Sequence, residues 1–178
     1  MELFIIVLVI LAILALIVIS TYNKLVRTKN SVEEAHSGID ISLLKRHDLI
    51  TDLVQVVKGY TKHESQILEE LVSIRSELSS NPDLANDHMN SIINRLNITI
   101  EAYPDLKASD QFLNLQKNIA NVEEHLQASR RFYNNNVTNY NNLIEGFPSN
   151  IVANMFNYQP KELFKTDVEN LVKPTVEY

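Results

Sequence analysis

The chain has 178 residues, which suits one domain with an appendage, and its 22 acidic and 16 basic residues give a net charge of -6. This acidic balance argues against a protein that grips the phosphates of a nucleic acid. The chain has no cysteine and its three glycines lie far apart. Disulfides, zinc–thiolate sites, cysteine nucleophiles and glycine-rich phosphate loops are therefore excluded.

The N-terminal region carries an unbroken run of apolar residues over positions 3–19. At about 1.5 Å per residue, a helix of this length spans about 25 Å, near the lower limit for crossing a bilayer. The flank before the run contains Glu2 and no basic residue, and no Ala-x-Ala sequence follows it, which argues against a cleaved signal peptide. We expect an uncleaved transmembrane helix over residues 3–22.

Basic residues follow the apolar run directly, at Lys24, Arg27 and Lys29. Because positive charge is enriched on the cytoplasmic side of membrane spans, this pattern predicts an external N-terminus and a cytoplasmic C-terminal body. The expected location is the cell membrane, which the chain crosses once.

The remainder of the chain is predicted to be all-α, since it shows no β pattern of useful length. Apolar residues recur at steps of three and four, and Asn81-Pro82-Asp83 and Tyr103-Pro104-Asp105 interrupt the pattern. Each apolar face needs a partner, so the short links predict an antiparallel four-helix bundle over residues 23–147. The expected helices are about 23–47, 48–80, 84–102 and 109–146.

The expected C-terminal tail, residues 148–178, contains large apolar residues that suit short helices around 149–156 and from about 160. These helices are expected to cover one end of the bundle. The full prediction is an N-terminal transmembrane helix that continues into a bundle of long helices and ends in a short helical tail.

The last long helix has the most regular pattern. Its side chains alternate steps of three and four residues, as the a and d positions of a coiled coil do. Ser109 or Asp110 can cap its start, and Gly146 suits its end. The expected core positions are Phe112, Leu115, Ile119, Val122, Leu126, Ser129, Tyr133, Asn136, Tyr140, Leu143 and Phe147.

Three segments of the chain carry a resemblance to a known family. The first, TYNKLVRTKNSVEEAHSGIDISLLKRHDLITDLVQVVKGYTKHE, resembles the opening of the LemA family of bacterial membrane proteins. The resemblance continues over EAYPDLKASDQFLNLQKNIANVEEHLQASRRFYNNNVTNYNNLIEGFPSNIVANMF and closes with QPKELF. It implies one N-terminal transmembrane helix and a cytoplasmic helical bundle, and it implies no particular reaction.

The sequence departs from the family's pattern at two positions. The family usually reads DLIPNLV where this chain has DLITDLV, with Thr51 in place of the proline. Because that proline would mark the first turn of a helix, the junction near Thr51 is left open between a turn and a continuous helix. His36 stands where the family usually has tryptophan, and we interpret it as a packing residue.

No metal, cofactor or catalytic site is predicted. Glu33 and His36 have the Glu-x-x-His spacing of di-metal bundle sites, but such sites need a second copy of the motif on another helix. Glu64 does not supply that copy, because the residue three positions later is Ile67 and not histidine. No Gly-x-Ser-x-Gly or His-Glu-x-x-His motif is present. We therefore expect a protein that is not an enzyme.

One polar cluster stands out, formed by Tyr60, His63, Glu64, Arg130 and Arg131. Glu64 falls on an apolar stripe, where an unpaired charge is costly, so an arginine of the last helix is its expected partner. We favour a buried ion pair that fixes helix register over a polar pocket for a ligand or peptide.

The last helix also carries an asparagine-rich face, residues 134–136 and 140–142. Asparagine is a mediocre helix former, and we interpret this face as solvated, with a partner-binding face as the alternative.

The leading functional hypothesis is a membrane-anchored, non-enzymatic scaffold or interaction module. It would present a surface to a partner in the membrane or cytoplasm, or to a second copy of itself. The alternative is a ligand sensor or enzyme that uses the polar cluster, which requires an open pocket with convergent polar groups.

Overall fold

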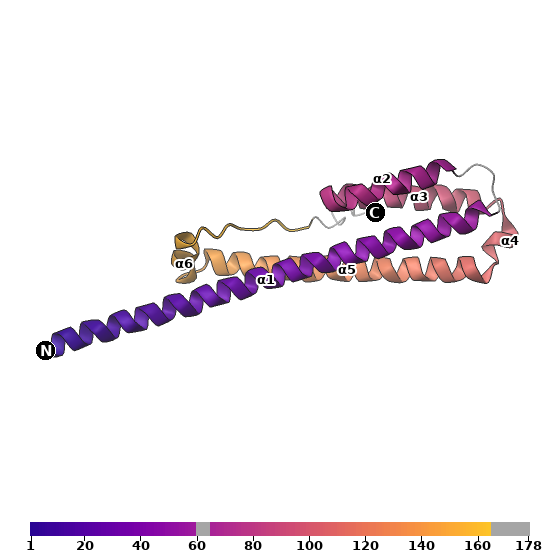
Figure 1. Cartoon of the computed structure of the whole chain (residues 1–178). Helices are drawn as coiled ribbons and strands as arrows, with labels where there is room; N and C mark the ends of the chain where they lie inside the picture. Colours follow the sequence, from indigo (N-terminus) through magenta and orange to yellow (C-terminus); the bar gives the residue numbers. More distant parts are fainter. Residues whose placement is uncertain (60–64, 165–178) are drawn as a thin grey trace, which may run out of the picture. The chain divides into compact units, whose positions relative to one another are not determined.

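The structure is a computed structural model that describes residues 1–59 and 65–164. Within these residues it contains six α-helices and no strand, which confirms the all-α class (Figure 1). The helices are α1 (Glu2–Lys58), α2 (Ser65–Ser80), α3 (Pro82–Ile100), α4 (Pro104–Lys107), α5 (Asp110–Glu145) and α6 (Ser149–Met155).

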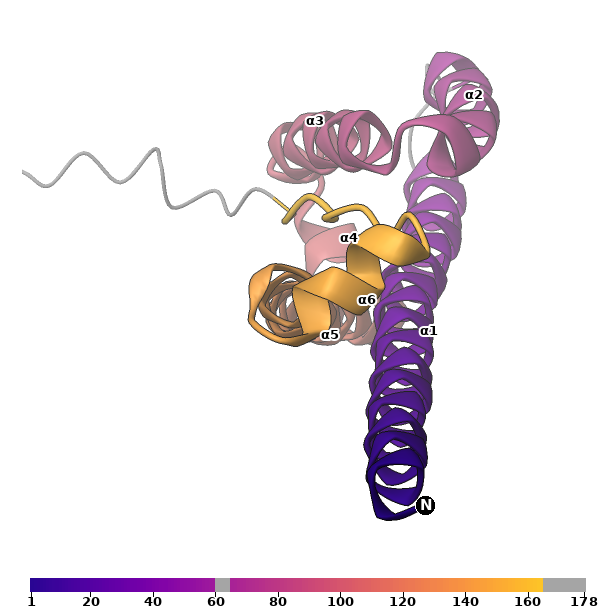
Figure 2. The ribbon, with the colours of Figure 1, turned by 90° about the vertical axis from the view of Figure 1, so that its left-hand side faces the viewer.

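Helix α1 is continuous from Glu2 to Lys58 (Figures 1 and 2). The predicted end of a helix at residue 47 and the start of another at residue 48 are therefore wrong. Thr51 has a backbone N–H that can join the helical hydrogen-bond pattern, which proline lacks, and its hydroxyl bonds the carbonyl of His47 at 2.9 Å. The predicted helix 48–80 is divided instead between α1 and α2.

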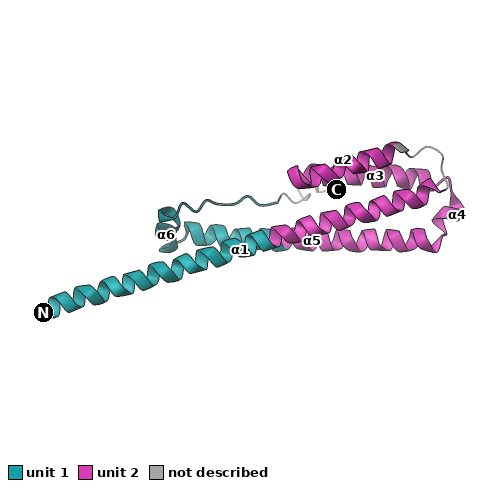
Figure 3. Cartoon of the chain, viewed as in Figure 1, with its two compact units in different colours: residues 1–34, 132–178 teal, residues 35–131 magenta. Residues whose placement is uncertain are grey.

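The chain forms two compact units, each described by itself (Figure 3). Unit 1 comprises Met1–Glu34 and Phe132–Tyr178, and unit 2 comprises Ala35–Arg131. Helices α1 and α5 contribute to both units, whereas α2, α3 and α4 belong to unit 2 and α6 belongs to unit 1.

In unit 2, α2 and α3 run antiparallel. Glu70 pairs with Arg95 at 2.6 Å and Glu77 pairs with His88 at 2.8 Å. Residues later in α2 therefore lie opposite residues earlier in α3. Asn81 lies between the two helices and caps α3, because its side chain accepts a hydrogen bond from the backbone N–H of Leu84. Large buried side chains of the unit include Ile39, Leu43, Leu71, Met89, Leu96 and Phe112. The four-helix-bundle arrangement stays a prediction.

The buried face of α5 differs from the predicted heptad. Phe112, Val122, Leu126, Tyr133 and Tyr140 are buried as expected. After Leu126, every second buried position lies one residue later in the chain than predicted. The later residue is the larger or more apolar one. The buried side chains are Arg130, Val137 and Ile144 rather than Ser129, Asn136 and Leu143, while Phe147 lies beyond the end of α5 and is exposed.

The apolar segment 3–19 lies in unit 1 and is uncovered in the structure, since its side chains are exposed apart from the intermediate Val18. The first buried residue of α1 is Leu25. By length and composition, α1 contains one candidate membrane span. Burial in a protein core does not explain this apolar stretch, because none of it is buried.

The tail matches the prediction in its first part and differs in its second. Helix α6 occupies most of the predicted helix 149–156. The helix predicted from about residue 160 is wrong over the described residues, because the chain from Tyr158 to Phe164 is extended. We refer to residues 158–164 as the C-terminal segment.

Candidate functional site

The structure places only part of the predicted polar cluster. Tyr60, His63 and Glu64 lie outside the described residues. Arg130 and Arg131 are neighbours on α5, where successive side chains point about 100° apart. Arg130 is buried and Arg131 is exposed, so Arg130 alone faces the interior of unit 2.

Arg130 makes an ion pair with the first turn of α3. Its Nη2 atom donates a hydrogen bond to Oδ1 of Asp83 at 3.3 Å. The guanidinium is 7% exposed, whereas Asp83 is mostly exposed. The expected pairing of Arg130 or Arg131 with Glu64 stays a prediction, because Glu64 lies outside the described residues.

Arg46 is the most connected polar side chain of unit 2. It is 4% exposed and lies on α1, among residues of α3 and α5. Its Nη1 donates to Asn86, its Nη2 donates to Asn90 at 2.6 Å, and the same Nη2 lies 3.0 Å from Oε2 of Glu123. The contact with Glu123 is an ion pair without the geometry of a directed hydrogen bond. One guanidinium thus joins three helices.

The electrostatics of Arg46 follow from its surroundings. Burial lowers the pKa of Arg46, the carboxylate of Glu123 raises it, and the nearby positive charge of Arg130 lowers it. Arginine stays protonated at any physiological pH. The cluster therefore holds permanent positive charge, and removing one partner leaves a buried cation poorly compensated.

This arrangement can fix the register of the helices that it joins. The two buried guanidinium groups are held by amide and carboxylate side chains and expose almost no surface to a ligand. A third contact has the same character, since His47 Nε2 lies 2.9 Å from the carbonyl oxygen of Leu71 on α2. Over the described ranges, no group of three or more metal-ligating side chains is present.

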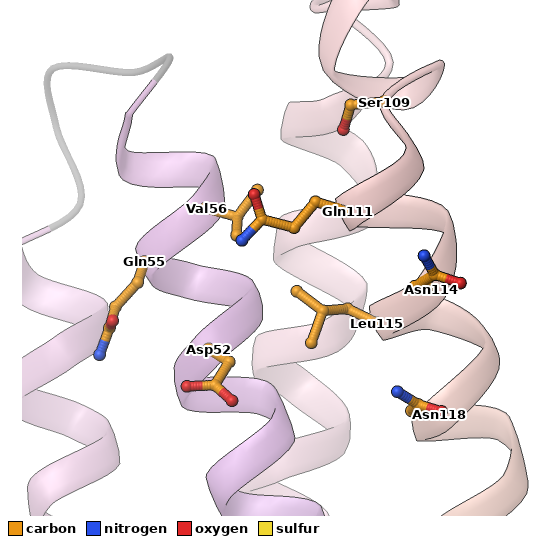
Figure 4. A pocket seen from close by; sticks show the side chains of 8 residues that line it. All are labelled: Asp52, Gln55, Val56, Ser109, Gln111, Asn114, Leu115 and Asn118. Atoms are coloured by element: carbon orange, nitrogen blue, oxygen red, sulfur yellow. The ribbon is translucent and has the colours of Figure 1, made fainter.

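An open groove of about 750 Å³ lies elsewhere in unit 2, between α1 and the start of α5 (Figure 4). Its apolar floor is formed by Val56 and Leu115, which are half-buried. The remaining lining side chains are polar and carry a single charge, that of Asp52. They are Asp52, Gln55, Ser109, Gln111, Asn114 and Asn118. A partly apolar groove edged by amides suits a polypeptide segment, which brings side chains to the floor and polar groups to the rim.

In unit 1, two asparagines of α5 hold the backbone of the C-terminal segment. Asn134 donates from Nδ2 to the carbonyl of Phe164 at 3.0 Å and accepts from its N–H at 2.8 Å. Asn141 repeats the pattern with Lys161, at 2.8 Å and 2.9 Å. Each amide therefore satisfies both backbone groups of one residue, as a neighbouring strand would.

The tyrosine directly before each of these asparagines also binds the backbone of the C-terminal segment. Tyr133 donates to the carbonyl of Glu162 at 3.3 Å, and Tyr140 donates to the carbonyl of Gln159 at 3.1 Å. Burial, the largest cause, raises the pKa of both phenols. The charge of Glu162 acts in the same direction on the pKa of Tyr133, and the interactions with Tyr158 and then Glu33 do so for Tyr140.

The two Tyr–Asn pairs, 133–134 and 140–141, match the repeat of the segment they bind. Seven residues of helix rise about 10.5 Å, and three residues of extended chain rise about 9–10 Å. One step of seven along α5 therefore meets one step of three along the C-terminal segment, in the opposite direction. The interpretation of the whole asparagine-rich face as solvated was wrong for Asn134 and Asn141.

Some sequence signals for these contacts were present. The Tyr-Asn dipeptide recurs after seven residues, which places both copies on one helical face. Asn86 lies beside the apolar stripe that contains Met89, and a polar residue there indicates a buried partner. Arg46, within Lys45-Arg46-His47-Asp48, was interpreted as a further partner for Glu64 near one end of the bundle, and its contacts with α3 and α5 were not predicted.

Comparison with known proteins identifies the family. The LemA family model matches residues 35–178. The chain belongs to the LemA family. It is also 30% identical over 159 residues to Protein LemA of Metamycoplasma hominis, an alignment that covers 83% of this chain and 73% of that protein. The match with the family model includes all of unit 2 and the part of unit 1 that begins at Phe132.

Proposed function

We propose that this LemA-family chain is a single-pass, membrane-anchored, non-enzymatic protein that presents the groove of unit 2 to a polypeptide partner. The observation that carries the proposal is the exposed apolar segment 3–19 on α1. In water such a surface is unfavourable by roughly 25 cal/mol for each Å² of apolar area. A bilayer covers it without any protein partner, since a helix satisfies its own backbone.

The charges next to the segment support an orientation. Lys24, Arg27 and Lys29 follow the apolar residues within three turns, and no acidic residue occurs between Glu2 and Glu33. By the positive-inside tendency, these charges support a cytoplasmic location for the chain that follows residue 22 and an external location for Met1.

The anchoring part of the proposal is tested by charge insertion. Replacing Leu8 and Leu11 together by lysine adds about 2.5–3.5 kcal/mol per residue to the cost of a span. We expect this variant to be lost from the carbonate-resistant membrane fraction. Leu113→Lys, at an exposed leucine of α5 outside the segment, is the matched control and is expected to stay in that fraction. Equal extraction of both variants would contradict anchoring through residues 3–19.

The partner-binding part rests on the groove, because the buried Arg46 and Arg130 expose too little surface to bind a ligand. A photo-cross-linking residue at Asn114, in the groove, should capture a defined polypeptide in membranes. The matched control is Asn97, an exposed asparagine of α3 that does not line the groove. The same products from both positions would count against the groove, and a product of twice the chain mass would identify a second copy as the partner.

A further inference from the structure

An apolar patch lies on the outer side of α6 and is largely uncovered in the described structure. It consists of Phe147, Ile151, Met155 and Phe156, which are 47% to 84% exposed. Ile151 and Met155 are one helical turn apart and so share a face, and Phe147 precedes Ile151 by four residues. We refer to these four residues as the α6 patch.

The opposite side of α6 packs inside unit 1. Ser149, Val152 and Ala153 are buried, so α6 is apolar on both its inner and outer sides. Figure 2, seen from the N-terminal side of α1, shows α6 in front of the end of α5 and beside α1. The α6 patch therefore belongs to the part of unit 1 that lies next to the apolar segment.

The sequence around α6 is uncharged. Residues 146–160 contain no Asp, Glu, Lys or Arg. The chain as a whole is 21% charged, so about three charges would be expected in fifteen residues. An exposed apolar surface without charged residues is unfavourable in water, and it suits contact with an apolar phase.

We propose that the α6 patch docks on the bilayer surface, in the leaflet from which α1 emerges. The proposal rests on the membrane anchoring of residues 3–19. Ring contacts set the level of the patch along α1, because Tyr22 lies 4.6 Å from Phe156 and 6.5 Å from Tyr158 between ring centroids. Tyr22 is three residues beyond Ile19, which corresponds to about 4.5 Å along the helix.

That level coincides with the membrane interface. The interfacial region is about 5–7 Å thick on each side of the hydrocarbon core, and aromatic residues such as Tyr22, Phe156 and Tyr158 are enriched there. A short helix with an apolar outer face lying in this region can bury its side chains at the boundary between headgroups and acyl chains.

The net charge of -6 does not favour contact with anionic lipid headgroups, but the charge of the chain next to the apolar segment does. Residues 20–32 of α1 contain three basic and no acidic residues. Lys29 and Lys161 line a cavity of about 460 Å³ together with Tyr22 and Phe156. Both ammonium groups lie near one carboxylate, that of Glu33, at 3.7 Å and 3.8 Å, so these three groups together carry one positive charge.

The absence of tryptophan from the chain allows a matched test. Three phenylalanines are replaced singly by tryptophan in the full-length chain, reconstituted in vesicles of phosphatidylcholine and phosphatidylglycerol with or without bromine on the acyl chains. Phe4→Trp reports on the anchor and Phe147→Trp on the α6 patch. Phe132→Trp is the control, since Phe132 is 58% exposed on the unit 1 part of α5 and lies thirteen residues before its end.

We expect bromine to quench at least half of the fluorescence of Phe4→Trp and Phe147→Trp, and to leave Phe132→Trp unchanged. Quenching of Phe4→Trp alone, with water-like emission from Phe147→Trp, would overturn docking and retain the anchor. Blue-shifted but unquenched emission from Phe147→Trp would show that protein covers the patch, and it would also overturn docking. If Phe4→Trp is unquenched, the anchoring proposal itself fails.

Discussion

The hydrogen bond from Arg46 to Asn86 should be a measurable part of the stability of unit 2. Both side chains are buried, and the guanidinium is charged at all relevant pH values. Asn86→Ala removes an acceptor from a buried cation. A hydrogen bond to a charged group contributes about 1.5–3 kcal/mol, and no water can reach the site easily to replace it. For a chain of this size, that loss corresponds to a decrease in Tm of about 3–12 °C.

The assay is thermal unfolding of the full-length chain in detergent, followed by circular dichroism. Asn94→Ala is the matched control, because Asn94 is an exposed asparagine of the same helix and alanine is the better helix former. Asn94→Ala should therefore not lower Tm. In an Arg46→Met background, Asn86→Ala should lose most of its effect, since the buried cation that would lose an acceptor is gone. Equal Tm values for Asn86→Ala and Asn94→Ala would refute the reasoning.

Three further predictions concern other parts of the molecule. Gly38→Ala should raise the free energy of unfolding by about 0.5–1 kcal/mol, because the added Cβ meets only Ser129 Oγ at 4.0 Å. Gly146→Ala should lower the free energy of unfolding, because its added Cβ would lie 2.8 Å from a backbone carbonyl oxygen. Asn141→Asp should increase proteolysis after Lys161 in limited trypsin digestion, because the carboxylate cannot donate to the carbonyl of that residue, and Asn142→Asp is the exposed control. The raised pKa of Tyr140 means that the folded state holds its proton more tightly than the unfolded state, so its contribution is present below about pH 10 and is lost as pH rises through the folded pKa. Tyr140→Phe should reduce the slope of this alkaline loss in urea titrations, and an unchanged slope would contradict it.

The helical class could be predicted from the sequence because periodicity and the scarcity of breakers act locally. The proline at position 82 marks the junction of α2 and α3. Ser109 caps the start of α5, because its hydroxyl oxygen accepts a hydrogen bond from the N–H of Phe112 at 3.3 Å. The continuity of α1 through residue 48 could not be settled in this way. A threonine permits a helix without requiring it, so tertiary packing of Ile50, Leu53 and Val57 decides.

The polar contacts were less predictable, because they join residues that are distant in the sequence. Arg46 meets Asn86 and Glu123 across three helices, and no local pattern encodes that distance. Asparagine is especially ambiguous, since the same side chain can face water or bind backbone. Asn134 and Asn141 take the second role only because the C-terminal segment lies beside them, and the expectation of a helix there concealed it.

Membrane topology is the most direct test of the central claim, and the lack of native cysteine makes it simple to measure. Single cysteines are placed at Glu2, before the apolar segment, and at the exposed Asp87 of α3. A membrane-impermeant maleimide is then applied to intact and to permeabilised cells. We predict labelling of Glu2→Cys in intact cells and of Asp87→Cys only after permeabilisation. Labelling of Asp87→Cys in intact cells, or recovery of the chain from the soluble fraction, would contradict a cytoplasmic body anchored through α1.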